Sequence, residues 1–236
     1  MIKLDILAFG AHPDDVELGI GGTIAKLAQK GLIVGIIDLT QGEMSSRGTV
    51  DERKTEAHNA GKILNVHIRE NLRLPDAQIS SSWEQKIEVI KVIREYTPQL
   101  IIAPMKDDKH PDHHNAHFLI REANYFSGLH KVNTGEQAPY RCPTLIYYYP
   151  YYEISFPHLL IDISEHFENK LSALKAYKSQ FFNPDYDAPE TFISSERFWK
   201  SIKERCAYWG SKINKEYAEA LYLLEPINIS ELRLFL

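Results

Sequence analysis

The run Leu4-Asp5-Ile6-Leu7-Ala8-Phe9 decides the fold, because it is a short apolar segment followed by a segment with helical periodicity. We expect this run to form a strand, and Gly21 to Lys30 to form a helix closed by Gly31. The same strand-then-helix order repeats further along the chain. The next expected strands are Leu32 to Leu39 and Leu100 to Ala103. The expected helices between them are Asp51 to Leu64 and Trp83 to Tyr96, which ends before Pro98.

Strands rich in Ile, Leu and Val that alternate with helices indicate a parallel sheet covered on both faces. The predicted fold class is therefore α/β, with a Rossmann-like, doubly wound, mostly parallel sheet. We expect residues 1–236 to form one domain, in which the part from about residue 140 adds strands and helices. Those strands are Leu145 to Tyr149 and Leu159 to Ile163. The helices are one ending near Tyr125, Ser164 to Phe181 and Thr191 to about Asn214, with Phe182 to Pro189 as a loop.

Composition narrows the class of function. The 236 residues carry a formal net charge of −5, so no basic surface excess attracts nucleic acid or anionic lipid, and a small soluble substrate fits better. Cys142 and Cys206 lie far apart and outside any CxxC pair, which argues against a disulfide framework and a thiolate metal site. We expect a cytoplasmic protein, because the chain shows neither a signal peptide nor about 18 uninterrupted apolar residues.

Two segments that follow expected strands are rich in metal-ligating side chains. They are Gly10-Ala11-His12-Pro13-Asp14-Asp15-Val16-Glu17 and Asp107-Asp108-Lys109-His110-Pro111-Asp112-His113-His114. Loops that follow parallel strands project toward the same end of the sheet. Together the segments can supply two imidazole nitrogens and one carboxylate oxygen to one ion, the ligand set of catalytic zinc sites that leave a position for water. The pattern therefore indicates a hydrolase.

Each segment alone also has a simpler interpretation. The first fits a tight turn, since Asp side chains satisfy turn amides and Pro presets the backbone angle. The second fits a solvated loop that enters a helix, with Asp112 capping the free amides. His113 and His117 form a competing ligand pair, because four-residue spacing on a helix puts two imidazoles on one face.

Other features favour packing over chemistry. The glycines lack the GxGxxG spacing of a dinucleotide site, so close helix packing or a helix entry explains them better: Gly19, Gly21 and Gly22. Tyr147 to Tyr152 fits half-buried strand packing, although an exposed set would suit a subunit interface or a sugar face. The apolar end Glu231 to Leu236 is expected to be covered by the fold or by a neighbouring subunit.

The motifs Ala11-His12-Pro13-Asp14-Asp15-Val16-Glu17-Leu18-Gly19 and His110-Pro111-Asp112-His113 resemble the LmbE-like, or PIG-L, family of zinc N-deacetylases. The resemblance covers most of the chain. It extends to Asp38-Leu39-Thr40, Gly42-Glu43, Arg53, Leu74-Pro75-Asp76 and Tyr177-Lys178-Ser179-Gln180. Within the family the chain looks most like the bacillithiol-biosynthesis deacetylases, which act on N-acetylglucosaminyl-malate. The resemblance thus implies hydrolysis of the N-acetyl group of a glucosamine conjugate, and a homo-oligomer, commonly a hexamer.

The resemblance also implies residue roles: Asp14 as the general base and, as zinc ligands, His12, Asp15 and His113. The chemistry agrees, since zinc lowers the pKa of a bound water to about 7 and a neighbouring carboxylate can then take its proton. Protonated His110 is the candidate to stabilise the oxyanion or protonate the departing amine, with Asp112 orienting and charging that imidazole. Fe²⁺ can use the same ligands, so the metal in the cell is left open.

The malate part of such a substrate carries two carboxylates, which Arg binds bidentately. Arg53 is the best candidate, and Arg47 and Lys109 in the same loops are weaker ones, because surface charge explains them equally well. Glu43 to Thr49 is polar and rich in small residues, and is a candidate lid. Alternatives are another N-acetylglucosamine conjugate, such as an inositol glycoside or a chitooligosaccharide, and a non-catalytic metal- or sugar-binding module. Asp14 argues against the module, since pure binding needs no further carboxylate beside the metal water.

Overall fold

A five-stranded parallel sheet forms the centre of the computed structural model, which describes residues 2–153 and 155–228. The order is β3-β2-β1-β4-β5, so the chain runs outward on one side of β1 and then returns to its other side at β4. This reversal between β1 and β4 is the switch point where ligands bind in doubly wound folds. The strands are β1 (Ile6–Gly10), β2 (Val34–Thr40), β3 (Ile68–Leu74), β4 (Leu100–Pro104) and β5 (Thr144–Tyr148).

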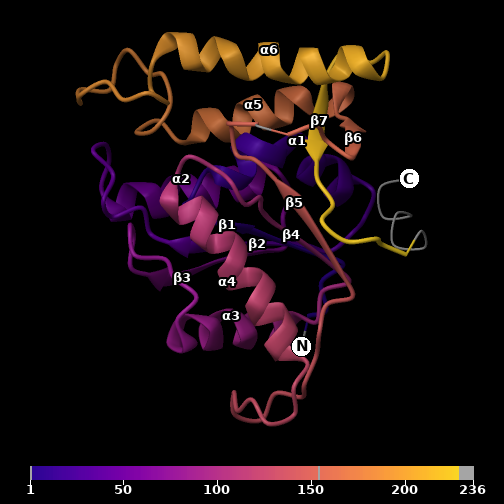
Figure 1. The fold of residues 1–236 in the computed structure, drawn as a ribbon. Coiled ribbons are helices and arrows are strands. Elements are labelled where there is room, and N and C mark those ends of the chain that lie inside the picture. The colour runs from indigo at the N-terminus through magenta and orange to yellow at the C-terminus, as the bar shows by residue number, and fades with distance from the viewer. Residues whose placement is uncertain (1, 154, 229–236) are drawn as a thin grey trace.

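Helices cover both faces of this sheet, as Figure 1 shows. One core cluster packs α1, α2, α5 and α6 on one face, and a second packs α3 and α4 on the other. The predicted doubly wound α/β class is therefore confirmed. None of the described helices is long and apolar enough to cross a membrane. The helices are α1 (Asp15–Gln29), α2 (Val50–Ile63), α3 (Trp83–Tyr96), α4 (Pro111–Ser127), the 3₁₀ turn η1 (Ser164–His166), α5 (Phe167–Ala176) and α6 (Glu196–Lys212).

Three helix boundaries differ from those expected. Helix α1 begins at Asp15, six residues before Gly21, because a break at Ile20 (φ −137°, ψ 20°) divides one helix into two parts. Helix α5 ends at Ala176, and the residues that follow turn away to contact other segments. Helix α6 begins at Glu196, since the Ser195 side chain accepts a hydrogen bond from the amide of Phe198 and caps it.

Two strands were not expected from the sequence. β3 is an edge strand with three charged side chains, so its apolar pattern is weak. β7 (Ala218–Leu221) pairs antiparallel with β6 (Leu159–Asp162) in a separate two-stranded sheet. The expected strand at β6 therefore does not extend the parallel sheet, whereas β5 does.

The break in α1 is held by side chains from the second half of the chain. The free carbonyl of Leu18 accepts hydrogen bonds from Lys170 Nζ and Arg205 Nη2, each at 2.8 Å. The Glu219 carboxylate accepts from the amides of Gly22 (3.0 Å) and Thr23 (2.6 Å), and also pairs with Lys170. The backbone groups that the break frees are thus satisfied in the interior, which fixes the first turn of α1.

Packing explains the glycines of α1 and the strand tyrosines. A Cβ on Gly19 would lie 2.2 Å from Cδ2 of Tyr148, and one on Gly22 would lie 2.7 Å from Cδ1 of Ile163. The interpretation of close helix packing is therefore confirmed at these two positions. Residues 147–149 are buried, so the half-buried packing expected for the tyrosines is complete there. The apolar end Glu231 to Leu236 lies outside the described residues.

Candidate active site

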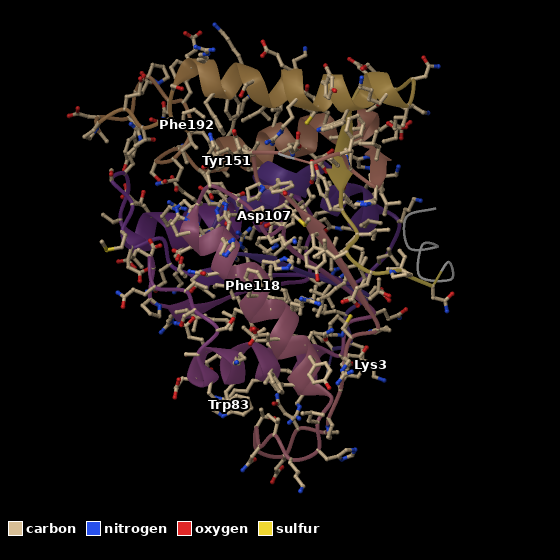
Figure 2. The ribbon with its side chains drawn as sticks, in the orientation of Figure 1. Lys3, Trp83, Asp107, Phe118, Tyr151 and Phe192 are labelled. Atoms are coloured by element: carbon tan, nitrogen blue, oxygen red, sulfur yellow. The ribbon has the colours of Figure 1, made fainter. Side chains whose placement is uncertain are left out.

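The two ligand-rich segments meet at the switch point of the sheet. His12 follows β1, Asp15 is the first residue of α1, and His113 lies in the first turn of α4 after β4. They line a cavity of about 240 Å³ whose far side is formed by other loops. Tyr151 lies on that side near Phe192 (Figure 2), with the two ring centroids 5.9 Å apart.

Asp15 lies between the two imidazoles. Its Oδ2 is 3.5 Å from Nδ1 of His12, and its Oδ1 is 3.1 Å from Nε2 of His113. The side chains of Asp15 and His113 are buried, and that of His12 is 12% exposed. The structure therefore places the Asp15 carboxylate between the two imidazoles, and the binding of a metal ion by these three residues stays a prediction.

Carboxylates also face the outer nitrogen of each imidazole. Nε2 of His12 lies 3.1 Å from Oδ1 of Asp76 and 3.3 Å from Oδ2 of Asp112. Nδ1 of His113 lies 3.2 Å from Oδ2 of Asp108. Metal-bound histidines usually give their second N–H to such a carboxylate, which fixes the tautomer and leaves the inner nitrogen for the metal. Each of the two imidazoles thus has a carboxylate within 3.5 Å of both of its nitrogens.

Asp112 does not have the contact expected of it. Its carboxylate accepts hydrogen bonds from the amides of Ala77 (2.8 Å) and Ile79 (3.3 Å) and faces His12, whereas only its backbone amide reaches His110, at Nδ1 (3.2 Å). The prediction that this carboxylate orients His110 is therefore wrong. The same contact makes His110, and not Asp112, the N-cap of α4, because the imidazole is close enough to take the free amide.

His110 stacks on His113 with ring centroids 4.7 Å apart. Among the described residues, two groups have ligand atoms that all lie within 4.8 Å of one another: His12 with His110 and His113, and His12 with Asp76 and Asp112. Neither group includes Asp15. Burial is the main cause that lowers the pKa of His110. This lowering favours the neutral imidazole over the protonated form expected from the sequence.

The competing pair of His113 and His117 is not formed. Nδ1 of His117 lies 3.1 Å from the carbonyl oxygen of Pro104, and its ring packs on Tyr147 at 4.6 Å. His117 belongs to neither metal-ligating group found in residues 2–153 and 155–228. The helix turns its two imidazoles to different surroundings.

Asp14 occupies the wall of the cavity in a strained backbone conformation. It is the N-cap residue of α1 with φ 112°, and its side chain caps no amide. Instead Oδ2 accepts a hydrogen bond from Nη2 of Arg53 at 3.2 Å, and the same Nη2 donates to the Pro13 carbonyl. Burial raises the pKa of Asp14 to about 7, with Arg53 as the main opposing influence. Left-handed backbone at a non-glycine residue is uncommon, and such strain clusters at functional sites.

The three expected substrate contacts have different surroundings. Arg53 lines the cavity and is tied to Asp14. Arg47 does not line it, because its guanidinium donates to three backbone carbonyls of a neighbouring segment. Lys109 also lies off the cavity, with Nζ 3.8 Å from the ring centroid of Tyr152. The structure thus corrects the expected cavity position of Arg47 and Lys109.

Sequence reasoning did not assign Asp76 and Asp108 to the site. Asp76 follows β3, so recognition of that strand would have put it at the same edge of the sheet as His12. Asp108 lies within the second ligand-rich segment, but nothing in the spacing distinguishes it from Asp107. Its contact with His113 depends on the conformation of the loop between β4 and α4.

The part of the chain that carries these residues matches a known family model. Residues 7–124 match the model described as PIG-L, GlcNAc-PI de-N-acetylase, which spans both ligand-rich segments. The chain belongs to the PIG-L family. The LmbE-like resemblance is thus confirmed at the level of the family, an enzyme family of deacetylases.

Three proteins show the range of this PIG-L member's relatives. Diacetylchitobiose deacetylase of Thermococcus kodakarensis is 29% identical over 94% of this chain and 84% of its own length. The probable N-acetyl-alpha-D-glucosaminyl L-malate deacetylase 2 of Bacillus anthracis is 24% identical over 75% of this chain and 81% of its own. The conserved protein TT1542 of Thermus thermophilus has a similar structure, with a TM-score of 0.85, 35% identity, and coverage of 95% of this chain and 96% of that one.

Proposed function

We propose that the protein is a zinc-dependent N-deacetylase of a small N-acetylglucosamine conjugate, with N-acetylglucosaminyl-malate as its substrate. The observation that carries the metal part is the arrangement of the imidazoles. One nitrogen of His12 and one nitrogen of His113 face the carboxylate of Asp15. The other nitrogen of each ring faces a further carboxylate, that of Asp76 for His12 and that of Asp108 for His113. A ligand set of two nitrogens and one oxygen with such outer partners fits zinc at a catalytic site.

Bound zinc would lower the pKa of a coordinated water toward 7 and polarise the acetyl carbonyl. Asp14 supplies the base for this chemistry, because its buried carboxylate lies next in sequence to the ligand Asp15 and caps no helix amide. Arg53 holds Asp14 in place by an ion pair. His110 lies on the cavity wall beside both proposed ligand imidazoles, where an N–H of the neutral ring can donate a hydrogen bond to the amide oxygen. Protonation of the leaving amine by His110 would require the imidazole to gain a proton first.

The cavity size supports a single sugar ring as the bound group. At about 240 Å³ it lies below the roughly 300–1,000 Å³ that is typical of pockets for drug-sized ligands. The acetamido sugar would fill it, and the group attached to the sugar would lie at the mouth. The sequence resemblance and the relative in Bacillus anthracis support malate as that group.

A second candidate substrate is a short chitooligosaccharide such as diacetylchitobiose. It is favoured by the relative in Thermococcus kodakarensis and by the charges at the cavity, where Arg53 is held by Asp14 and Arg47 and Lys109 lie elsewhere. A neutral sugar at the mouth needs no cation. The non-catalytic binding module is not favoured, since the family is one of deacetylases.

The test is release of a free amine from three substrates: N-acetylglucosaminyl-malate, diacetylchitobiose and plain N-acetylglucosamine. Each is offered to zinc-loaded protein and to protein stripped by a chelator. We expect metal-dependent release that is fastest with the malate conjugate. Faster release from diacetylchitobiose than from the malate conjugate would favour the second candidate substrate. Equal amine release before and after complete metal removal would refute the zinc mechanism. His12→Ala and His113→Ala should lose both metal and turnover.

A further inference from the structure

Two loops that are far apart in sequence close the cavity opposite the metal ligands. The first, residues 41–49, contributes Gly42, Met44 and Ser45 to the lining. The second, residues 179–195, contributes Ile193. The position of one loop relative to the other therefore decides how much space a substrate has.

The loops are joined by a buried set of hydrogen bonds that centres on Arg47. Its Nε donates to the carbonyl of Ser179 at 2.6 Å, and its Nη1 donates to the carbonyls of Ala188 (3.1 Å) and Pro189 (2.8 Å). The guanidinium also packs on the ring of Tyr186, 5.0 Å from its centroid. Arg47 is only 5% exposed, so these contacts are shielded from water.

Gln180 completes the connection from the other side. Its Oε1 accepts from Ser45 Oγ at 3.1 Å, and its Nε2 donates to the Arg47 carbonyl at 2.7 Å. The approach of the two backbones is close, since a Cβ on Gly48 would lie 2.7 Å from Oγ of Ser179. We name the group of Ser45, Arg47, Ser179 and Gln180 the interloop contact.

The first loop is also tied to the metal-ligand side. The amide of Met44 donates to Oδ2 of Asp76 at 2.9 Å, and Oδ1 of the same carboxylate faces His12. The first loop is therefore tied through Met44 to Asp76, which faces His12, and through Ser45 and Arg47 to the second loop. The candidate lid thus has contacts on both sides of the cavity.

We propose that Arg47 is a positioning residue, which sets the width of the cavity by joining the two loops and does not itself bind substrate. The inference rests on the proposed function in so far as this cavity is the substrate site. Only arginine suits the position, because its rigid planar fork reaches several carbonyls at once, whereas a lysine ammonium is one point on a flexible stem. None of the residues of the interloop contact is a metal ligand or the base, so loosening it should affect substrate binding more than the chemical step.

The experiment compares Arg47→Lys with the wild type and with Arg197→Lys, an exposed control on α6. We expect faster amide hydrogen exchange in Arg47→Lys at residues 43–48 and also at residues 185–190, about 140 positions away in sequence. Zinc content should equal that of the wild type. KM should rise with kcat nearly unchanged, up to the roughly 10²-fold loss of kcat/KM that a displacement of about 1 Å can cause. Arg197→Lys should match the wild type throughout.

Unchanged exchange at residues 185–190 in Arg47→Lys would overturn the inference, as would a fall in kcat with constant KM. Tyr186→Leu removes only the ring beneath the guanidinium, so it gives a milder version of the same test if Arg47→Lys does not fold. Exchange and metal content are measured without substrate. A wild-type protein that releases no amine would therefore refute the proposed function, while the exchange result would still decide whether Arg47 joins the loops.

Discussion

Oδ1 of Asp76 lies 3.1 Å from Nε2 of His12, although the two residues are 64 positions apart in sequence. The contact joins the loop after β3 to the loop after β1. A carboxylate that accepts the outer N–H of a ligand histidine raises the basicity of the inner nitrogen and holds the ring in one orientation. If His12 binds the proposed zinc, Asp76 is therefore expected to affect metal affinity, which no spacing pattern in the sequence suggests.

Asp76→Asn should weaken zinc binding by about 10- to 100-fold, the usual effect of losing such an outer partner. Competition with a chromophoric chelator measures the change directly. Asp51→Asn, at an exposed position in the first turn of α2, is the matched control and should keep the affinity of the wild type. Unchanged affinity in Asp76→Asn would show that Asp112 alone is enough for His12.

Asp14→Asn should keep the metal and lose roughly 10²- to 10⁴-fold in kcat, because the amide cannot take a proton. Asparagine tolerates the left-handed backbone of this position, so the change should not disturb the fold. Asp107→Asn makes the same change at an exposed left-handed aspartate outside the cavity and should be fully active. Turnover by Asp14→Asn near the wild-type rate would exclude it as the base.

Arg53→Gln should move the acid limb of the pH profile of kcat/KM to higher pH. The base works as a carboxylate, and burial already raises the pKa of Asp14 to about 7 while Arg53 lowers it. Loss of the cation raises that pKa further, so more of the base is protonated at a given pH. Arg53→Lys keeps a cation and should shift the limb less. A loss restricted to acidic substrates, with the limb in place, would instead restore Arg53 as a binder of substrate carboxylates.

Gly19→Ala should destabilise the protein by about 1–3 kcal/mol, the usual range for overpacking, because the added methyl meets the buried ring of Tyr148. Gly21→Ala is the matched control in the same helix. A Cβ there finds its nearest atom at 3.4 Å, an ordinary contact, and alanine favours helix by about 1 kcal/mol over glycine. Urea unfolding compares the two. Equal free energies of unfolding for the two variants would mean that α1 and β5 can move apart enough for the added methyl group without a loss of stability.

The central fold was predictable because its inner strands are fully buried and mostly apolar. Apart from Asp38 and Thr40 in β2, the residues of β1, β2 and β4 are apolar, glycine or proline, which leaves apolar runs in the sequence. β3 and β7 were not predicted from the sequence. β3 is an edge strand with charged side chains, and β7 has the short sequence Ala-Glu-Ala-Leu. In β3 the alternation of Ile68, Leu72 and Leu74 with polar residues is interrupted by Glu70, and β7 is too short at four residues to show a period of two.

Some residues of the site were likewise predictable from the sequence, and others were not. His12, Asp14, Asp15 and His113 stand in two short segments directly after strands, so the sheet alone brings them together. Asp76 requires knowledge of β3. The position of Arg47 depends on carbonyls more than 130 residues further along the chain, which local sequence does not encode. The expected hexamer and the single domain of residues 1–236 stay predictions.

The break in α1 has a consequence for how the protein is made. The amide of Gly22 is satisfied by Glu219, 197 residues later, and a ribosome releases the N-terminal part of a chain first. During synthesis, the break in α1 therefore lacks this partner until 197 further residues have been made after Gly22. A nascent chain therefore cannot complete the support of the first turn of α1, which carries Asp15, before Glu219 has been made.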